Sequence, residues 1–505
     1  MYSRIYLEDD RGNFYHVKPA TVDGKAIPYR VDRGKSKEIH TTVSNHLFNA
    51  MLGPGKYKLT AEHGKEFLPS VVEFEITKGP VQKTVRLRRW SSVADQGWYS
   101  GEVHIHRKLS EMPVVVRAED LNVVFPLTYW VTDTEAAPST HNKSGEAAPR
   151  PELIKVSDQH VIWPVNTEYE IFSVRGKQHT LGAFFVLGHS KPFELKTPPV
   201  GPIVQQAREQ DALIDLDKHN WPWSMMLIPT MKMDLFELTN NHIWKTDFLF
   251  GDWYPEYAAD YMKLEMDKEG RFTELGWIHF GFENYYTLLN CGFRISPSGG
   301  TASGVHPVPA GYGRVYVRTP KLRKEGFSFE EWKKGLKQGS SFVTTGPMME
   351  FTIDGLDPGQ KMQVDLNSPT SKQAVLKLRL PSRGKTRVEF VKNGKVIQPK
   401  TIKMSKENKV MKLTATSNLE FDQSAWVCAR CFHQLPSGKW VFAHSAPFYF
   451  QKGEEPIQPR KAEVEYLIKR VSDEIKRHQN VLTKEQLKEF EAALDFYRGK
   501  REIAR

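Results

Sequence analysis

Residues 123–131, VVFPLTYWV, open a series of apolar runs that decides the fold of this chain. Three more runs follow at 181–189 (LGAFFVLGH), 212–219 (ALIDLDKH) and 234–241 (DLFELTNN), and helical stretches such as PIVQQAREQD at 202–211 separate them. Near-continuous apolar strands that alternate with helices are typical of a buried, mostly parallel sheet. Such sheets bind ligands at the carboxyl ends of their strands, so we expect the chemistry of the chain there.

The regions on either side of this central unit, which we place at residues 96–335, have a different pattern. Residues 1–95 consist of short alternating segments divided by Gly and Pro, which predicts an antiparallel β-sandwich. This segment resembles sandwiches of the prealbumin or carboxypeptidase-regulatory type. Residues 336–453 return to alternating segments and predict a second β-sandwich. Apolar residues at helical spacing predict a helical hairpin in the tail, 454–505. The chain is therefore predicted to be multidomain.

Two local signals sharpen these predictions. Asn393 and Gly394 lie between two alternating runs, and both residues tolerate the positive φ of a type I′ turn, so they predict a β-hairpin. Thr483 and Gln486 form a capping box, which predicts that the second helix of the tail begins there.

Length and composition bound the class of protein. The chain has 505 residues, 39% of them hydrophobic and 26% charged, and its mean hydropathy is −0.51, which excludes a disordered chain and a membrane core. No uncharged apolar stretch approaches the roughly 20 residues needed to cross a bilayer, so we expect no membrane span. The opening residues MYSRIYLEDDRGNFYH lack the apolar region of a signal peptide, so the chain as written is expected in the cytoplasm, and export stays open as the alternative.

The formal net charge is +11 and the sequence pI is about 9.2. This balance favours an anionic substrate. The basic residues are scattered and do not alternate with aromatic residues along a helix or stripe, so we expect no nucleic-acid partner. The sequence leaves the oligomeric state open.

Three cysteines, Cys291, Cys428 and Cys431, are too few for a disulfide framework and indicate reduced thiols. Cys428 and Cys431 have the CxxC spacing of a zinc or redox site, but no second CxxC is present. The surrounding WVCARCF alternates as a strand does. We therefore interpret both as strand residues.

The segment WYSGEVHIHR, residues 98–107, gives the clearest chemical signal. If VHIH is a strand, His104 and His106 point to the same face, roughly 6 to 7 Å apart at the backbone. Both imidazoles then reach one cation through bonds of about 2.0 Å. Two half-buried histidines bonded to the backbone are the structural alternative. The further histidines and carboxylates at segment ends in the central region favour the metal.

Several segments together resemble a known family. They are SGEVHIHR (100–107), NTEYEIFSVRGKQHTLGAFFVLGH (166–189), ALIDLDKH (212–219), FELTNN (236–241) and LLNCGFRISPSGGTASGVHPVPAGYGRVYV (288–317). They resemble the polymerase and histidinol phosphatase (PHP) superfamily, and within it the CehA/McbA-type metallohydrolases, named for carbaryl-hydrolysing members. The resemblance implies a distorted α/β barrel whose strand ends hold one to three divalent ions. These ions, usually Zn²⁺, Mn²⁺ or iron, activate water to attack an ester, carbamate or phosphoester.

The resemblance also implies a set of metal ligands. His104 and His106 match the opening pair of the family, and Glu168 matches the acidic ligand that can bridge two ions, with Glu170 as the alternative at that place. His179 and His219 match the histidines of two later segments.

The chain departs from the family pattern at three places. Gly101-Glu102 stands where the family has Gly-Asp, Thr134 stands where a histidine ligand is expected, and the late motif has Ala302 without its aspartate and with its histidine displaced to His306. These losses make a trinuclear site doubtful. We expect one ion or two, of Zn, Mn or Fe.

Other residues carry weaker hypotheses. Asp133 or Glu237 could act as general base or orient the nucleophile, and a turn-capping or purely structural role is the alternative for each. Trp221 and Trp223 could stack on a sugar or an aromatic leaving group, or seal the core. His306 could be a late ligand, a substrate contact or a loop residue. Arg314 could clamp a carboxylate or phosphate, or form a salt bridge.

The leading hypothesis is a metal-dependent hydrolase that acts on a small-molecule or glycan-like substrate. The alternative is a catalytically decayed protein of the same fold that binds a glycan or a protein, because the missing ligands at Thr134 and Ala302 are those of a weakened site.

Overall fold

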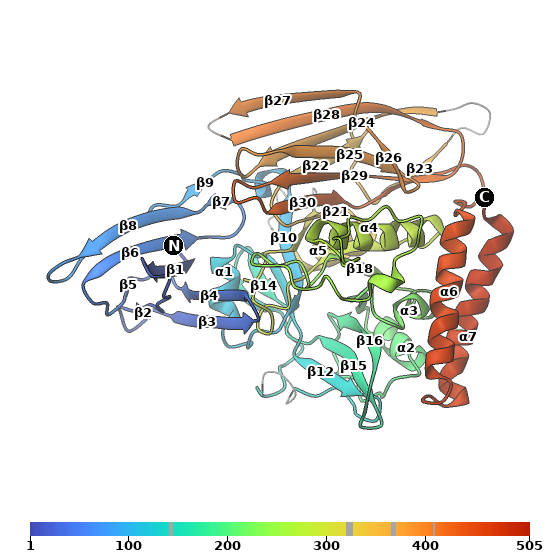
Figure 1. Ribbon diagram of the computed structural model, residues 1–505, viewed down its shortest axis with the longest axis horizontal. Coiled ribbons are helices and arrows are strands. Elements are labelled where there is room, and N and C mark those ends of the chain that lie inside the picture. Colours follow the sequence, from blue (N-terminus) through green and yellow to red (C-terminus); the bar gives the residue numbers. More distant parts are fainter. Residues whose placement is uncertain (141–144, 320–326, 365–369, 408–409) are drawn as a thin grey trace.

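The computed structural model describes residues 1–140, 145–319, 327–364, 370–407 and 410–505. It is a multidomain, β-rich fold that ends in a pair of helices. In Figure 1 the amino-terminal sheet lies on the left, the carboxy-terminal sheets at the top and the final two helices on the right, with the central region between them. This coarse architecture confirms the predicted multidomain organisation and the helical pair of the tail.

The amino-terminal region is built around one antiparallel sheet. Its strands, in spatial order, are β3 (Ala26–Arg33), β4 (Ser36–Val43), β1 (Ser3–Asp9), β6 (Gly55–Glu62) and β8 (Ser70–Ile76). Two short antiparallel ribbons accompany it, and they are β2 (Lys18–Pro19) with β5 (Phe48–Asn49), and β7 (Phe67–Leu68) with β9 (Arg88–Arg89). Alternate residues such as Tyr57 and Leu59 enter the core of this region, as a period of two requires.

The first sheet of the central region has six strands. In spatial order they are β12 (Tyr129–Asp133), β15 (Thr167–Val174), β16 (Lys177–Leu187), β17 (Leu213–Leu216), β18 (Leu235–Thr239) and β19 (Ser296–Gly299). The sheet is mixed, because β15, β16 and β17 are antiparallel neighbours while the other pairs are parallel. Most of its strand pairs are parallel, as expected, and the antiparallel run β15–β16–β17 is the departure from that expectation. Arg175 and Gly176 have φ values of 50° and 73°, and a two-residue turn with positive φ at both positions closes a hairpin.

A second, twelve-stranded sheet runs from the central region into the carboxy-terminal region. Its main path is β13 (Ile154–Ser157), β14 (His160–Ile162), β11 (Val123–Pro126), β10 (Trp98–Ile105), β20 (Arg314–Arg318), β21 (Ser341–Thr344), β30 (Trp440–Ser445), β29 (Ala425–Gln434), β25 (Thr386–Lys392) and β26 (Lys395–Ile397), and β31 (Phe448–Gln451) and β23 (Lys361–Gln363) pair beside it. β20 and β21 are hydrogen-bonded neighbours, so the sheet continues across the domain boundary that the sequence suggested near residue 335.

The carboxy-terminal region has two packed layers. The second layer is a four-stranded antiparallel sheet with the order β22 (Met348–Ile353), β24 (Thr370–Leu380), β28 (Val410–Phe421) and β27 (Thr401–Glu407). Phe351 and Leu376 of this sheet share a core with Phe390 of β25, which makes the region a β-sandwich. The predicted hairpin is confirmed, because Asn393 and Gly394 join β25 to β26 and both have positive φ.

Cys428 and Cys431 both lie in β29 and are fully buried. Cys428 belongs to the core of the central region, and Cys431 belongs to the core of the sandwich. The two side chains therefore point to opposite faces of the strand, as residues three apart must. Both are strand residues, as the sequence predicted.

Seven α-helices are found in the described residues. They are α1 (Met112–Ala118), α2 (Gly201–Glu209), α3 (Ser224–Met231), α4 (Glu274–Asn290), α5 (Phe329–Gln338), α6 (Lys461–His478) and α7 (Lys484–Gly499), and three short 3₁₀ turns are η1 (Ala94–Gln96), η2 (Pro255–Tyr257) and η4 (Lys500–Ile503). The capping box before α7 is confirmed, since Thr483 Oγ1 accepts from Gln486 N at 3.2 Å and Gln486 Oε1 accepts from Thr483 N at 3.0 Å. Within the described residues, none of the helices combines the length and apolar character that a membrane crossing requires.

Candidate metal centre

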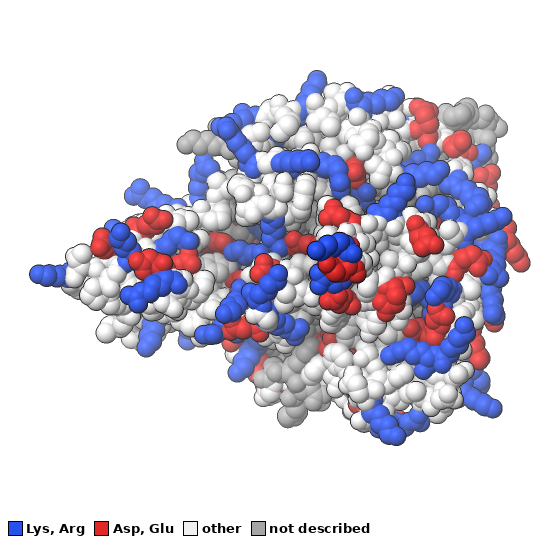
Figure 2. Space-filling view, viewed as in Figure 1, with Lys and Arg blue, Asp and Glu red and all other residues white. Residues whose placement is uncertain are grey.

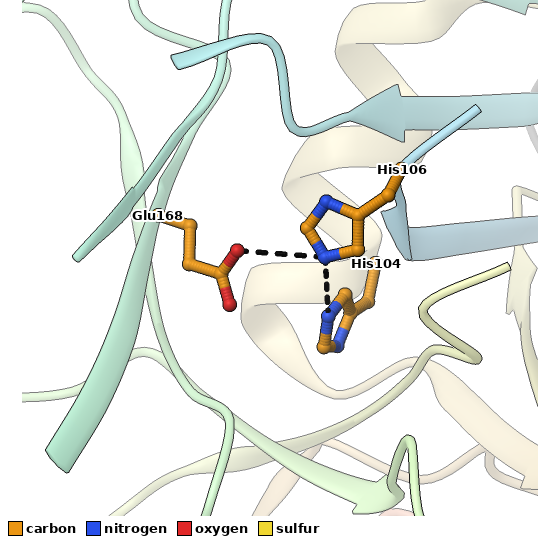
Figure 3. Close-up of side chains that lie close together, drawn as sticks. All are labelled: His104, His106 and Glu168. Atoms are coloured by element: carbon orange, nitrogen blue, oxygen red, sulfur yellow. Dashed lines mark hydrogen bonds and ion pairs between the residues drawn. The ribbon is translucent and has the colours of Figure 1, made fainter. Parts of the chain in front are cut away.

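Strand β10 brings the two histidines together. His104 is near its end and His106 follows directly after it, where the backbone N–H of His106 donates to Ser303 O at 2.8 Å. The two Nε2 atoms lie 3.1 Å apart, and both side chains are about 1% exposed. Figure 3 shows both rings turned toward the same point. The spacing of two along a strand therefore has the effect that the sequence predicted.

Glu168 of β15 reaches the same point from the other sheet (Figure 3). Its Oε2 is 3.4 Å from His106 Nε2, and its side chain is 1% exposed. Two ligand atoms bonded at about 2.0–2.1 Å to one tetrahedral ion are about 3.3 Å apart. The distances between the ligand atoms of His104, His106 and Glu168 match this value, so the three side chains can share one cation. Ligand atoms of His104, His106 and Glu168 all lie within 4.8 Å of one another.

The other ring nitrogen of His104 faces carboxylates. Its Nδ1 lies 3.1 and 3.2 Å from the two carboxylate oxygens of Glu237 in β18, and 3.5 Å from Oδ1 of Asp217, which follows β17. These groups meet because β17 and β18 are parallel neighbours whose carboxyl ends coincide. A metal-binding histidine commonly uses its second nitrogen in this way, which fixes the tautomer and the ring orientation.

The carboxylates carry an excess of buried negative charge. Burial, followed by the nearby charge of Asp217, raises the pKa of Glu237 well above its ordinary value. A cation bound at the histidines would offset this cost.

Lys218 already supplies one positive charge to the cluster. Its Nζ contacts Asp217 and lies 2.9 Å from Glu170 Oε1 and 3.7 Å from Glu168 Oε1, with the side chain 3% exposed. Burial disfavours the ammonium, but Asp217, Glu170 and Glu168 more than offset this and raise the pKa of Lys218 above its ordinary value. The side chain is therefore a buried cation.

Two of the expected ligands lie elsewhere. His179 of β16 has its Nε2 2.8 Å from Nδ1 of His478 in α6, so it contacts the helical tail. The ring of His219 stacks on Phe236, and its Nδ1 is 3.2 Å from Nδ2 of Asn284 in α4. Burial lowers the pKa of His219 to about 3. Within the described residues, neither histidine joins a group of three close ligand atoms.

Asp133 caps a turn. Its Oδ2 accepts from Ser173 Oγ at 2.5 Å and from Gly176 N at 2.7 Å, and its Oδ1 accepts from Glu135 N at 2.8 Å. These hydrogen bonds hold the β15–β16 hairpin and match the turn-capping alternative. Glu237, by contrast, lies in the centre and orients His104.

The two tryptophans that follow His219 are both buried. Trp223 is fully buried and packs so closely on Gly182 that a Cβ there would lie 1.8 Å from its ring, which matches the core-sealing alternative. Trp221 is 3% exposed, and its ring centroid lies 4.9 Å from Lys218 Nζ.

His306 and Arg314 belong to the loop that follows β19 and to the start of β20. The backbone carbonyl of His306 accepts from the hydroxyl of Tyr29, and its ring lies 5.2 Å from that of Trp244. Arg314 donates to backbone carbonyls, to Gly311 O at 2.7 Å and to Glu119 O at 2.9 Å. Arg314 therefore contacts backbone carbonyl groups of this loop and of the end of α1.

The departure at Glu102 also has a structural consequence. Its carboxyl group accepts from Gly311 N at 2.5 Å and contacts the hydroxyl of Thr301, so it ties β10 to the loop after β19. Burial raises the pKa of Glu102 to about 8. Glu102 therefore holds this loop, whereas Glu237 orients His104.

Asp217 and Lys218 were missed by sequence reasoning. The available signal was their position directly after the apolar run ALIDL, where the carboxyl end of a strand is expected. The run was predicted to contribute His219, yet the two residues before it are the ones that enter the cluster.

Comparison of the chain with protein-family models, curated proteins and solved structures gives no match. The resemblance of its motifs to the PHP superfamily therefore stays a prediction.

Proposed function

We propose that this protein is a metal-dependent hydrolase that activates water for attack on an ester, carbamate or phosphoester. The proposal includes a PHP-like central unit and one divalent ion held by His104, His106 and Glu168. The observation that carries it is the convergence of two imidazole nitrogens 3.1 Å apart with a carboxylate oxygen 3.4 Å from one of them.

The donor set fits such an ion. Two neutral imidazoles and one carboxylate suit Zn²⁺, and they also suit Mn²⁺ or iron. Three protein ligands leave a position open, as in catalytic zinc sites. When bound, the ion would lower the pKa of water and polarise a carbonyl or phosphoryl oxygen.

The residues around the ligands have separate tasks in this proposal. Glu237 lies 3.1 Å from His104 Nδ1 and accepts a hydrogen bond from the ring N–H there. The lone pair of Nε2 is then directed at the ion. Glu237 is a positioning residue. The burial of these side chains keeps bulk water away, so each charge acts more strongly than it would in solvent.

The same burial favours a second candidate, a centre that binds a metal without catalysis. Structural metal sites are closed, and His104, His106 and Glu168 are each about 1% exposed. In that case the protein would be the decayed, glycan- or protein-binding form of the fold.

Metal content and turnover measured on the same samples separate these functions. The full chain is loaded with Zn²⁺ or Mn²⁺, and p-nitrophenyl esters and phosphoesters are assayed with and without chelator. The hydrolase proposal expects bound metal and chelator-sensitive turnover in the wild type, and loss of both in the His104→Ala/His106→Ala variant. His160→Ala is the matched control, because His160 contacts Ser157 in the β13–β14 turn. Bound metal without turnover of these substrates or of carbamates supports the second candidate. The absence of both metal and turnover contradicts both candidate functions.

A further inference from the structure

The Lys218 ammonium group lies among several carboxylates of the cluster. It contacts Asp217 and lies 2.9 Å from Glu170 and 3.7 Å from Glu168. Oxygen atoms of several carboxylates that surround one small cation are the usual environment of Mg²⁺ or Mn²⁺. Here the cation belongs to the chain itself.

Glu168 links this ammonium to the histidine side of the centre. One of its oxygens, Oε2, is 3.4 Å from His106 Nε2, and the other, Oε1, is 3.7 Å from Lys218 Nζ. In two-metal hydrolases the ions are about 3.5–4 Å apart and act together on the attacking and leaving oxygens. Glu168 thus has the position of a carboxylate that bridges two cations, one of which is Lys218.

We propose that the Lys218 ammonium replaces the second ion of a two-metal site, so that the centre holds one metal ion and one lysine. This inference rests on the proposed function. It assigns Lys218 the second positive charge that stabilises negative charge developing on the substrate, a task that the ion of a binuclear enzyme otherwise performs.

The surroundings of Lys218 hold the ammonium in place. Trp221 presents its ring face 4.9 Å from Nζ, and Glu170 is itself fixed because its Oε2 accepts from Trp130 Nε1 at 3.1 Å. The side chains of Lys218 and Asp217 are 3% and 0% exposed. Removal of this charge would leave buried carboxylates without compensation, which is strongly unfavourable unless another cation enters.

Metal stoichiometry tests the inference. The full chain is saturated with Mn²⁺ and desalted, and metal per chain is determined by mass spectrometry. We expect one ion in the wild type and two in Lys218→Gln, whose side chain is neutral and of similar length. Mn²⁺ electron paramagnetic resonance gives a second readout, since two ions sharing Glu168 would show a spin-coupled spectrum that one ion cannot. Lys333→Gln is the control, because Lys333 is also buried but pairs with Asp211, and one ion is expected.

Each outcome decides a different statement. Two ions in the wild type, or one ion in a folded Lys218→Gln protein, would overturn the role of Lys218 while leaving a metal centre in place. No ion in the wild type would instead overturn the proposed function. If Lys218→Gln does not fold, Lys218→Met removes the charge with less polar burial, and the wild-type ratio remains a test by itself.

Discussion

Two short-range pairs of residues of metal-binding types lie on or directly after strands of the same twelve-stranded sheet, His104 with His106 and Cys428 with Cys431. The histidines are two positions apart, and their Nε2 atoms lie 3.1 Å from each other. The cysteines are three positions apart, and they enter two different hydrophobic cores. On a strand the parity of the spacing decides whether two side chains can share a ligand, because successive side chains alternate between faces.

The environments differ as much as the spacing. Carboxylates surround the histidine pair, and Glu237 and Asp217 lie within 3.5 Å of His104 Nδ1. Both cysteines are fully buried, Cys428 with its Sγ 3.5 Å from His444 Nε2, and burial raises the pKa of each thiol to about 12. A cation is favoured in the first environment, whereas a thiolate is disfavoured in the second.

The largest effect is expected from His104→Ala. This change removes one ligand and the side chain that Glu237 orients, so metal affinity should fall by more than about 100-fold. Isothermal titration with Zn²⁺ measures the affinity, and circular dichroism checks that the variant is folded. A His104→Ala protein that binds Zn²⁺ as the wild type does would contradict the assignment of the centre.

A smaller effect is expected from Glu237→Gln. The amide oxygen still accepts from His104 Nδ1, but the negative charge behind the ring is lost, so metal affinity should fall by about 10-fold to 100-fold. The same titration measures it. An unchanged metal affinity in Glu237→Gln would contradict the positioning role of Glu237. Glu170→Gln is the companion variant, because Glu170 is about as close to Lys218 as Glu237 is to His104.

The cysteine pair predicts a pH dependence of stability. The folded-state pKa of Cys431 is about 12, above its unfolded value near 9, so the folded protein keeps the thiol protonated. The stabilisation from this difference is fully present below pH 9 and is lost as pH rises from 9 to 12. At pH 10 the loss is about 1.4 kcal/mol for one thiol.

When the pH is raised from 8 to 10, the free energy of unfolding should therefore fall by about 1.4 kcal/mol less in Cys431→Ala than in the wild type. Urea denaturation at both pH values measures the free energy of unfolding. The change creates a cavity that costs roughly 1–2 kcal/mol at either pH, so only the difference between the two pH values is informative. Equal losses in both proteins would show that the thiol ionises readily in the folded state.

The smallest effect on metal binding is expected from His179→Ala. His179 contacts His478 of α6 and lies outside the ligand group, so metal content should stay within experimental error of the wild type. Loss of the inter-element contact should weaken the attachment of the helical tail, seen as faster amide hydrogen exchange in α6. A His179→Ala protein without metal would restore His179 to the ligand set.

Local signals in the sequence predicted local structure well. The turn at Asn393-Gly394, the capping box of Thr483 and Gln486, and the shared face of His104 and His106 each depend on residues a few positions apart. Steric preference, a short hydrogen bond and strand periodicity fix such features before any distant contact forms.

Distant contacts could not be predicted in the same way. His179 and His478 are 299 positions apart, and no periodicity near His179 indicates which helix will cover it. The antiparallel β15–β16 hairpin was missed because an Arg175-Gly176 turn is a weaker signal than Asn-Gly, although both residues adopt positive φ. Lys218 was missed because its position among three carboxylates depends on the way in which separate segments of the chain come together at the strand end.

The continuity of the twelve-stranded sheet has a practical consequence. β20, next to the strand that carries His104, pairs on its other side with β21, and β21 pairs with β30 of the sandwich. A fragment that stops before β21 would expose an unpaired row of backbone N–H and C=O groups on β20, next to the strand that carries His104, and such edges recruit other chains. The sandwich therefore protects the centre from self-association, and fragments made to isolate the central unit should retain it.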